Sequence, residues 1–396
     1  MKTIIKNILI TSVAFALFST AHAKTALDKL QTIDKSSLYV MSKGQPVFND
    51  NANQPLIPAS TMKLITAWLA LQKWGEHYRF STNFYLDPAT NILWVKGSGD
   101  PYLVSEELQE IALVIKRKGL RYIGGIGLDT NYYQQNMVMP GTGTTNNPYD
   151  AVPSAVAVNF NSINLKKKNG KVRSAEAQTP LTPISKSMAN RFKKGTLRVN
   201  TGRDPRTGEK YFAEVLAAML RQRGVTVGKQ IIGGRVPVNK VYYRHQNSRT
   251  LGEMVKPMLK YSTNFIANQL VLNLAAETYH RPANPADVKR YMQTQMQQQF
   301  GWQGITMNDG AGLSRANRVS AKQLVELLNA FSKYRHLMPE IKPGVYAKSG
   351  TLNRVSTLAG YVVKNNEWKP FAVMMNQTVP YGLRTQIAQE LRHQVN

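Results

Sequence analysis

The stretch at residues 57–75, IPASTMKLITAWLALQKWG, decides how this chain is organised. Its apolar residues recur at helical spacing and Gly75 follows the last of them, which predicts a largely buried helix that begins near Ser60. Lys63 lies three residues after Ser60, so the two side chains share one helix face about 5–6 Å apart. No other serine has a lysine at this spacing. The pair is either a serine nucleophile with a lysine base, or a helix-capping serine beside a lysine that reaches solvent.

A lysine acts as a base only when its pKa falls from about 10.4 toward neutrality, which requires burial or a second positive charge nearby. The segment GVYAKSGTL supplies such a charge in Lys348. Two cations about 5 Å apart, at an effective dielectric constant of about 20, repel by roughly 3 kcal/mol, or about 2 pKa units. On a strand, this segment would present an ammonium, a hydroxyl and the bare backbone of Gly350 to an extended peptide. The alternative is an edge strand that its lysine protects from aggregation.

The third candidate segment is KYSTNFIANQL, where Ser262 and Asn264 stand two apart at a break between apolar helical segments. The triplet Ser-x-Asn is weak evidence by itself, since it occurs twice elsewhere in the chain. One of these, in FSTNFY, continues into an alternating strand, so we interpret Ser81 as structural. If the three candidate segments form one site, Lys63 should be buried against Lys348, Ser262 and Asn264.

The rest of the chain changes character several times along its length. We expect a hairpin at 36–51, a strand-rich part at 79–243 with helices near 106–118 and 211–223, helices from 251 to 333, and then three strands and a final helix. Strands at both ends and a long insertion between them predict an α/β core interrupted by an inserted domain.

The composition limits the cellular setting and the chemistry. Among 396 residues there is no cysteine, which excludes disulfides, and no histidine pair has the close spacing of a helical zinc motif. Residues 1–23 place two lysines before an apolar run and a small-residue triplet, which predicts a signal peptide cut after Ala23. The apolar run is shorter than the roughly 20 residues of a spanning helix. We therefore expect an exported protein with no membrane anchor, no metal and no organic cofactor.

The formal charge of +28 is unevenly distributed, because residues 161–244 hold 19 Lys and Arg against 4 Asp and Glu. The simplest interpretation is a solvated basic face. The sharper one is a surface that docks onto anionic polymers of the cell envelope, since an exported protein rarely meets nucleic acid. We expect no nucleic-acid partner.

The three motifs Ser-x-x-Lys, Ser-x-Asn and Lys-Ser-Gly, in this order, resemble those of the penicillin-recognising serine enzymes. Further segments, among them VKGSGDPYL, AVPSAVAVNFNS and NDGAGLSRANRVS, are similar to the class C low-molecular-mass penicillin-binding proteins. These are the D-alanyl-D-alanine carboxypeptidases and endopeptidases of the penicillin-binding protein 4 type. The resemblance implies a transpeptidase-like core, an antiparallel sheet flanked by helices with a helical subdomain, in residues 24–80 and 245–396. Residues 81–244 would form an inserted accessory domain, which is short for the two accessory domains of larger members.

The resemblance also implies a role for each motif residue. Ser60 would be acylated with Lys63 as its general base, and Ser262 would relay the proton to the departing D-alanine. Asn264 would hold Lys63 and the substrate amide. The backbone N–H groups of Ser60 and Thr351 would form the oxyanion hole. The substrate-binding residues that it implies are Lys348, Ser349, Gly350 and Thr351, together with Asn159 and Arg315 in segments that resemble substrate-lining parts of the family.

These features predict a periplasmic serine peptidase that acts on peptidoglycan stem peptides through an acyl-enzyme on Ser60 and is inhibited by β-lactams. Two departures from the family pattern, Thr263 for the usual aspartate and Ser349 for the common threonine, remove no reacting group. One alternative is a β-lactamase or esterase on the same fold, which fast penicillin turnover would reveal. Another is a catalytically weak peptidoglycan-binding protein that docks through the basic insertion.

Overall fold

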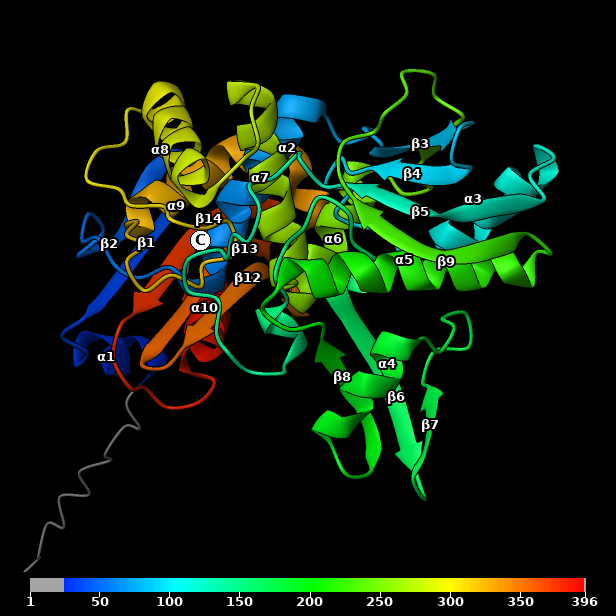
Figure 1. Ribbon diagram of the computed structural model, residues 1–396. Coiled ribbons are helices and arrows are strands. Elements are labelled where there is room, and N and C mark those ends of the chain that lie inside the picture. Colours follow the sequence, from blue (N-terminus) through cyan, green and yellow to red (C-terminus); the bar gives the residue numbers. More distant parts are fainter. Residues whose placement is uncertain (1–24, 395–396) are drawn as a thin grey trace, which may run out of the picture.

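A six-stranded antiparallel sheet lies towards one end of the structure, a computed structural model that describes residues 25–394 (Figure 1). The strand order is β11-β12-β13-β14-β1-β2, so the N-terminal hairpin pairs with β14 from the far end of the chain. The bounds are β1 Ser36–Ser42, β2 Gln45–Asp50, β11 Glu340–Lys342, β12 Val345–Leu352, β13 Val355–Lys364 and β14 Glu367–Met375. The expected antiparallel sheet, formed by both ends of the chain, is confirmed.

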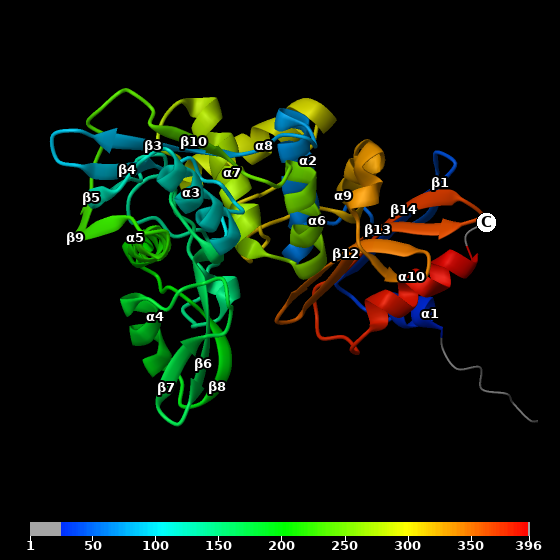
Figure 2. The same ribbon diagram turned by 90° about the vertical axis from the view of Figure 1, so that its right-hand side faces the viewer.

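Helices cover both faces of this sheet (Figure 2). One face packs against α1 (Ala26–Gln31) and α10 (Leu383–Gln394), whose apolar residues join those of β12 to β14 in one cluster. The other face packs against α9 (Ala321–Phe331) and against a block of four further helices. The apolar residues of these helices and of this face form a larger cluster. The helices of that block are α2 Met62–Trp74, α6 Leu251–Tyr261, α7 Asn264–Tyr279 and α8 Pro285–Phe300.

The helix expected at Ser60 begins slightly later than predicted. A 3₁₀ turn, η1 (Ala59–Thr61), precedes α2, and neither η1 nor α2 has a side-chain hydrogen bond at its N-cap. Ser60 therefore does not cap the helix, and the capping interpretation is wrong. Ten of the thirteen residues of α2 are buried, Lys63 among them, because α2 is enclosed by α6, α7 and α9.

The part predicted as an insertion contains a five-stranded mixed sheet with the order β10-β3-β4-β5-β9, and its strand β10 continues two residues past the predicted boundary at 244. Its bounds are β3 Ser81–Asp87, β4 Ile92–Lys96, β5 Tyr122–Asp129, β9 Thr226–Gly233 and β10 Tyr243–Gln246. The two helices expected here are confirmed as α3 (Ser105–Arg117) and α5 (Pro205–Gln222). The second starts six residues before the predicted position, because Asp204 caps it and Pro205 suits its first turn.

A second, smaller sheet with the order β7-β6-β8 belongs to the same insertion. Together with α4 (Pro183–Met188) it forms a lobe that projects from the body of the molecule in both views (Figures 1 and 2). We call residues 162–200 the β6–β8 lobe; its strands are β6 Ser162–Lys168, β7 Lys171–Ser174 and β8 Gly195–Asn200. Its apolar residues share one cluster with α3 and α5, so the lobe packs on the five-stranded part.

The predicted signal peptide at residues 1–23 lies outside the described residues. Within residues 25–394, no helix combines the length and apolar character needed to cross a membrane.

Candidate active site

Hydrogen bonds hold the segment before α2 against the six-stranded sheet. Asn376, just after β14, accepts a hydrogen bond from the Ile57 N–H at 2.7 Å and donates to the Ile57 carbonyl at 3.2 Å. Thr357 on β13 donates to the Pro58 carbonyl at 2.7 Å. Ala59 adopts a positive φ of 48°, an unfavourable conformation for a residue with a Cβ. These contacts turn the chain sharply just before Ser60, which is half-buried.

Two glycines allow neighbouring segments to approach the turn at Ser60. A Cβ built on Gly312 would lie 1.8 Å from the Ala59 carbonyl oxygen, and one built on Gly350 would lie 2.8 Å from the Ser60 nitrogen. Real Cβ atoms do not approach other atoms so closely, so both positions require glycine at this backbone geometry. Gly350 therefore brings β12 directly beside the Ser60 N–H, where the resemblance implies an oxyanion hole with Thr351.

The Lys63 side chain is fully buried and aims at the Ser60 hydroxyl. Its Nζ lies 3.0 Å from Ser60 Oγ, 2.8 Å from Asn264 Oδ1 and 2.7 Å from the Ala311 carbonyl. The Asn264 and Ala311 oxygens can only accept hydrogen bonds. In the neutral amine, the two N–H bonds are therefore directed to these oxygens, and the lone pair faces the hydroxyl, the one partner that can donate. This is the geometry of a general base.

The surroundings of Lys63 also favour its neutral form. Burial lowers the pKa of Lys63 well below its usual value, and the Lys348 charge lowers it further, while Asp309 opposes the shift. The expected repulsion between the two lysines is thus present, although burial is the larger cause. The sequence could not reveal this order, because burial depends on helices that are distant along the chain.

Ser262 and Asn264 occupy the junction between α6 and α7. Ser262 ends α6 in the left-handed conformation, with φ 60° and ψ 40°, and is half-buried. Asn264 donates its Nδ2 to the Tyr149 carbonyl at 2.9 Å, which turns Oδ1 toward Lys63. The insertion thereby orients a residue of the core. The expectation that Lys63 is buried against Asn264 is met, but its third hydrogen-bond partner is Ala311 rather than Ser262.

The loop at 309–314 is a part of the site that motif reasoning missed. Asp309 is fully buried and accepts hydrogen bonds from the N–H groups of Ala311, Leu313 and Ser314 at 2.9–3.1 Å. These bonds fold the loop so that the Ala311 carbonyl points at Lys63. The signal in the sequence was the segment NDGAGLSRANRVS, which matched the family pattern but suggested no role for a backbone carbonyl.

Lys348 lies on β12, as predicted, and only 2 % of it is exposed. Its Nζ donates to the Ser349 carbonyl at 2.8 Å. Burial, and then the Arg384 charge, lower the pKa of Lys348 to about 8. Arg384, on α10, donates to the Thr351 hydroxyl at 2.8 Å and to the Gly350 carbonyl at 2.5 Å. Nothing in the sequence marked Arg384, because α10 carries no motif.

The two remaining candidates have different surroundings. The Asn159 side chain accepts from the Ser105 N–H at 2.9 Å and donates to the Ser105 hydroxyl at 2.8 Å, so it holds the start of α3. It is buried, and these hydrogen bonds give it a structural role; its predicted contact with substrate stays a prediction. Arg315 is exposed and donates to the Asn353 carbonyl at 2.9 Å, just beyond β12. Its predicted contact with substrate stays a prediction.

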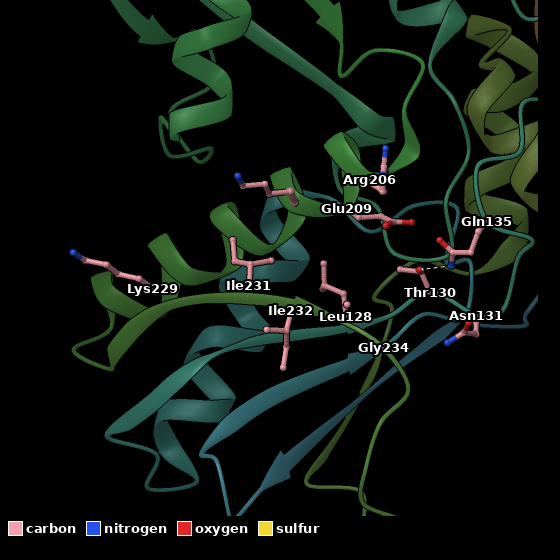
Figure 3. A pocket seen from close by; sticks show the side chains of 12 residues that line it. Leu128, Thr130, Asn131, Gln135, Arg206, Glu209, Lys229, Ile231, Ile232 and Gly234 are labelled. Carbon is pink, nitrogen blue, oxygen red and sulfur yellow. Dashed lines mark hydrogen bonds between the residues drawn. The ribbon is translucent and has the colours of Figure 1, made fainter.

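A separate cavity of about 590 Å³ lies in the insertion (Figure 3). It opens at the ends of β5 and β9 beside the start of α5, and Glu209, whose pKa burial raises to about 7, lines it. None of the predicted catalytic residues lines this cavity. In the part of the chain from 25 to 394, no group of three or more His, Asp or Glu side chains could hold a metal ion.

The fold places the Ser60 hydroxyl within hydrogen-bond distance of a buried amine, which is the pairing that a serine hydrolase with a lysine base would require. Residues 25–342 match the model of the D-Ala-D-Ala carboxypeptidase 3 (S13) family. The chain therefore belongs to this family, and it is a serine peptidase of the D-alanyl-D-alanine carboxypeptidase kind.

Individual relatives agree with the family match. The chain is 23% identical to a D-alanyl-D-alanine carboxypeptidase of Actinomadura sp. (strain R39), over 84% of this chain and 76% of the relative. It is 25% identical to D-alanyl-D-alanine carboxypeptidase DacB of Haemophilus influenzae, over 81% of this chain and 80% of the relative. Penicillin binding protein 4 of Haemophilus influenzae has a similar solved structure, with a TM-score of 0.76 and 21% identity. The match covers 94% of this chain and 98% of that chain. That protein was also solved in complex with a β-lactam.

Proposed function

We propose that this protein hydrolyses the peptide bond after D-alanine in peptidoglycan stem peptides, as a carboxypeptidase, a DD-endopeptidase or both, through an acyl-enzyme on Ser60. The observation that carries the proposal is the position of Lys63. Its Nζ is 3.0 Å from Ser60 Oγ, and its two other partners can only accept hydrogen bonds. A buried, neutral amine in this position can take the serine proton.

In the first step, the neutral Lys63 amine accepts the hydroxyl proton while Ser60 Oγ attacks the carbonyl carbon of the penultimate D-alanine. The carbonyl oxygen becomes negative and accepts hydrogen bonds from the Ser60 and Thr351 N–H groups. Fixed backbone donors of this kind stabilise the transition state by several kcal/mol. The C–N bond then breaks, and the proton held by Lys63 passes through Ser262 to the departing amine. Water hydrolyses the resulting ester and regenerates Ser60.

Lys348 on β12 would bind the carboxylate on the leaving side of the scissile bond. Lys348 is buried and its charge is not balanced by an acidic hydrogen-bond partner in the contacts described, so a substrate carboxylate would stabilise the protonated form. The Ser349 and Thr351 hydroxyls flank it on the same strand. This arrangement favours peptides with a free carboxylate at that position.

Labelling with a fluorescent penicillin tests the assignment of Ser60. Wild-type protein should form a covalent adduct that survives denaturation, and the Ser60→Ala variant should form none. Ser81→Ala is the matched control, because FSTNFY is nearly a copy of YSTNFI but lies on β3, and it should label like the wild type. Labelling of Ser60→Ala would refute the assignment, as would unlabelled wild-type protein. Fast penicillin turnover would instead support the β-lactamase alternative.

The domain division and the setting are part of the same proposal. We assign residues 24–80 and 245–396 to the catalytic domain and 81–244 to an inserted accessory domain, which is supported by the separate sheets of the two parts. Residues 1–23 would direct export to the periplasm.

The β6–β8 lobe would dock onto an anionic polymer of the envelope. It holds ten Lys and Arg against one acidic residue, Glu176. Four of the cations, Lys166, Lys168, Lys171 and Arg173, line a hollow of about 440 Å³.

A further inference from the structure

A cavity of about 660 Å³ lies beside the far end of β12 and reaches Thr351. The hairpin turn between β12 and β13, the segment after β14 and the first turns of α10 enclose it. Much of its lining carries amide or hydroxyl groups, which include Asn353, Gln377, Thr378, Tyr381, Gln386 and Gln389. Such groups can form hydrogen bonds with a peptide backbone.

Arg384 is placed where this cavity meets the proposed catalytic strand. It is half-buried and lines the cavity, and its Nη1 donates to Gly350 and Thr351 on β12. Among the contacts of the described residues, the hydrogen bonds of Arg384 come from Nη1 alone. A guanidinium has five N–H donors in a fixed fork, so Nε and Nη2 remain for a carboxylate ligand.

Lys348 lies in the middle of β12 and Arg384 contacts Gly350 and Thr351 further along this strand, where the Arg384 charge helps to lower the pKa of Lys348. Like charges held this way repel, and a bound anion relieves the repulsion. The carboxylate of a single departing D-alanine could bind both cations. That D-alanine is the end of the substrate, so it would not extend into the cavity. A cross-linked dimer differs, because the residue that carries this carboxylate is joined to a second stem peptide.

We propose that the cavity beside β12 is a subsite for the leaving half of a cross-linked stem-peptide dimer, with Arg384 as a carboxylate ligand at its entrance. This inference rests on the proposed function and assigns the endopeptidase reaction to this site. The bond broken is the amide after D-alanine. The amine that departs with the proton belongs to the second stem, which the cavity holds in place until it is released.

Filling the cavity tests this proposal. Gln386→Trp places a large side chain on the first turns of α10, where Gln386 is exposed and lines the cavity. Cleavage of a cross-linked dimer should fall by about tenfold or more, because the leaving half is displaced from its position. Release of D-alanine from a pentapeptide should stay as in the wild type. Gln394→Trp, the same change at the other end of α10, should leave both reactions unchanged.

Removing the Arg384 charge tests whether Arg384 is a carboxylate ligand. Arg384→Gln should raise KM about tenfold for both substrates, since each presents a carboxylate to the same place. Arg384→Lys should recover part of the loss. Arg392→Gln removes a charge from the same helix at a residue whose Nε donates to the Val363 carbonyl, and it should leave KM unchanged.

The outcomes separate this inference from the proposed function. If penicillin fails to label wild-type Ser60, the proposed function itself fails. If Ser60 is labelled but the wild type does not cleave the dimer, or Gln386→Trp affects both substrates equally or neither, the leaving-side subsite is refuted. If Arg384→Gln behaves like Arg392→Gln, Arg384 is no carboxylate ligand.

Discussion

The catalytic core and the β6–β8 lobe both contain conspicuous lysines, but in opposite surroundings. In the core, Lys63 is 0 % exposed and Lys348 is 2 % exposed, and the pKa of each is lowered. In the lobe, Lys166, Lys168 and Lys171 are exposed on β6 and β7 of the three-stranded sheet and keep their contact with water. Because desolvation destabilises an ammonium ion, burial converts a solubilising side chain into a base or an anion site. The residue type alone does not distinguish these uses.

The position of each lysine along its element explains the difference. Helix α2 is buried around most of its circumference, so a lysine within it cannot reach solvent. Strand β6 alternates, so Lys166 and Lys168 occupy outward positions while Leu165 faces the core. The comparison predicts that changes to core lysines alter chemistry, whereas changes to lobe lysines alter only association with other molecules.

The largest expected effect follows from removing the proposed base. Lys63→Gln should lower the rate of acylation by a fluorescent penicillin by about 10²–10⁴-fold, the usual contribution of a general base. Lys166→Gln in the lobe is the matched control and should acylate at the wild-type rate. Time courses of labelling measure both. Equal rates for the two variants would abolish the distinction between core and lobe lysines.

The stability of the site depends on glycine at position 312 more than that of the β1–β2 hairpin depends on glycine at position 44. Gly312→Ala should destabilise the protein by about 3 kcal/mol, since the new Cβ would collide with the Ala59 carbonyl at a position with φ +81°. Gly44→Ala is the control, with a similar φ of +77° and nothing within 4 Å, and should cost about 1 kcal/mol. Urea unfolding measures both changes. If the two variants are equally stable, the close approach at Ala59 does not constrain the site.

The pH dependence distinguishes a buried lysine from an exposed one. In its proposed role, Lys348 must be protonated to bind the substrate carboxylate, and its pKa is lowered to about 8, so kcat/KM should fall about tenfold for each pH unit above 8. Lys348→Arg should remove this alkaline limb, because arginine stays charged. Initial rates on a pentapeptide between pH 6 and 10 provide the measurement. A flat profile up to pH 10 in the wild type would show that Lys348 titrates like a lysine on the surface.

The smallest effect on catalysis is expected in the lobe. Replacing Lys166, Lys168, Lys171 and Arg173 together with glutamine should change acylation by less than about twofold, since salt screens charges beyond roughly 10 Å. This variant should elute from an anionic polymer column at a lower salt concentration than the wild type. Unchanged retention would contradict the docking proposal, while a large loss of acylation would contradict the separation of the two regions.

Much of the site was predictable because motif residues carry reactive groups. Ser60, Lys63, Asn264 and Lys348 are recognisable by type and spacing, and the structure places them at one junction of α2, α7 and β12. The residue type of Asn159 is ambiguous, because an amide suits a substrate site as well as it suits the start of a helix. Its contacts with Ser105, which only the tertiary structure shows, establish the second use.

Other parts of the site have no signature in the residue type. Every residue has a backbone carbonyl, so the sequence does not mark that of Ala311. Its direction toward Lys63 depends on the loop folded around Asp309. Arg384 is one of many basic residues, and α10 brings it to Thr351 from 33 positions away. The 3₁₀ turn at Ser60 likewise arises from contacts with β13 and from a residue after β14, not from a local preference for that turn.

By itself, the sequence determined which reactive groups exist, their spacing along each element, and the alternation that separates core strands from the insertion. These properties follow from covalent geometry and local periodicity, which act over a few residues. The tertiary structure decided which lysines lose their water, where the Lys63 lone pair points, and which backbone atoms complete the site. Those outcomes depend on burial and on contacts between segments that are more than 300 residues apart, as between Ile57 and Asn376. No local pattern records them.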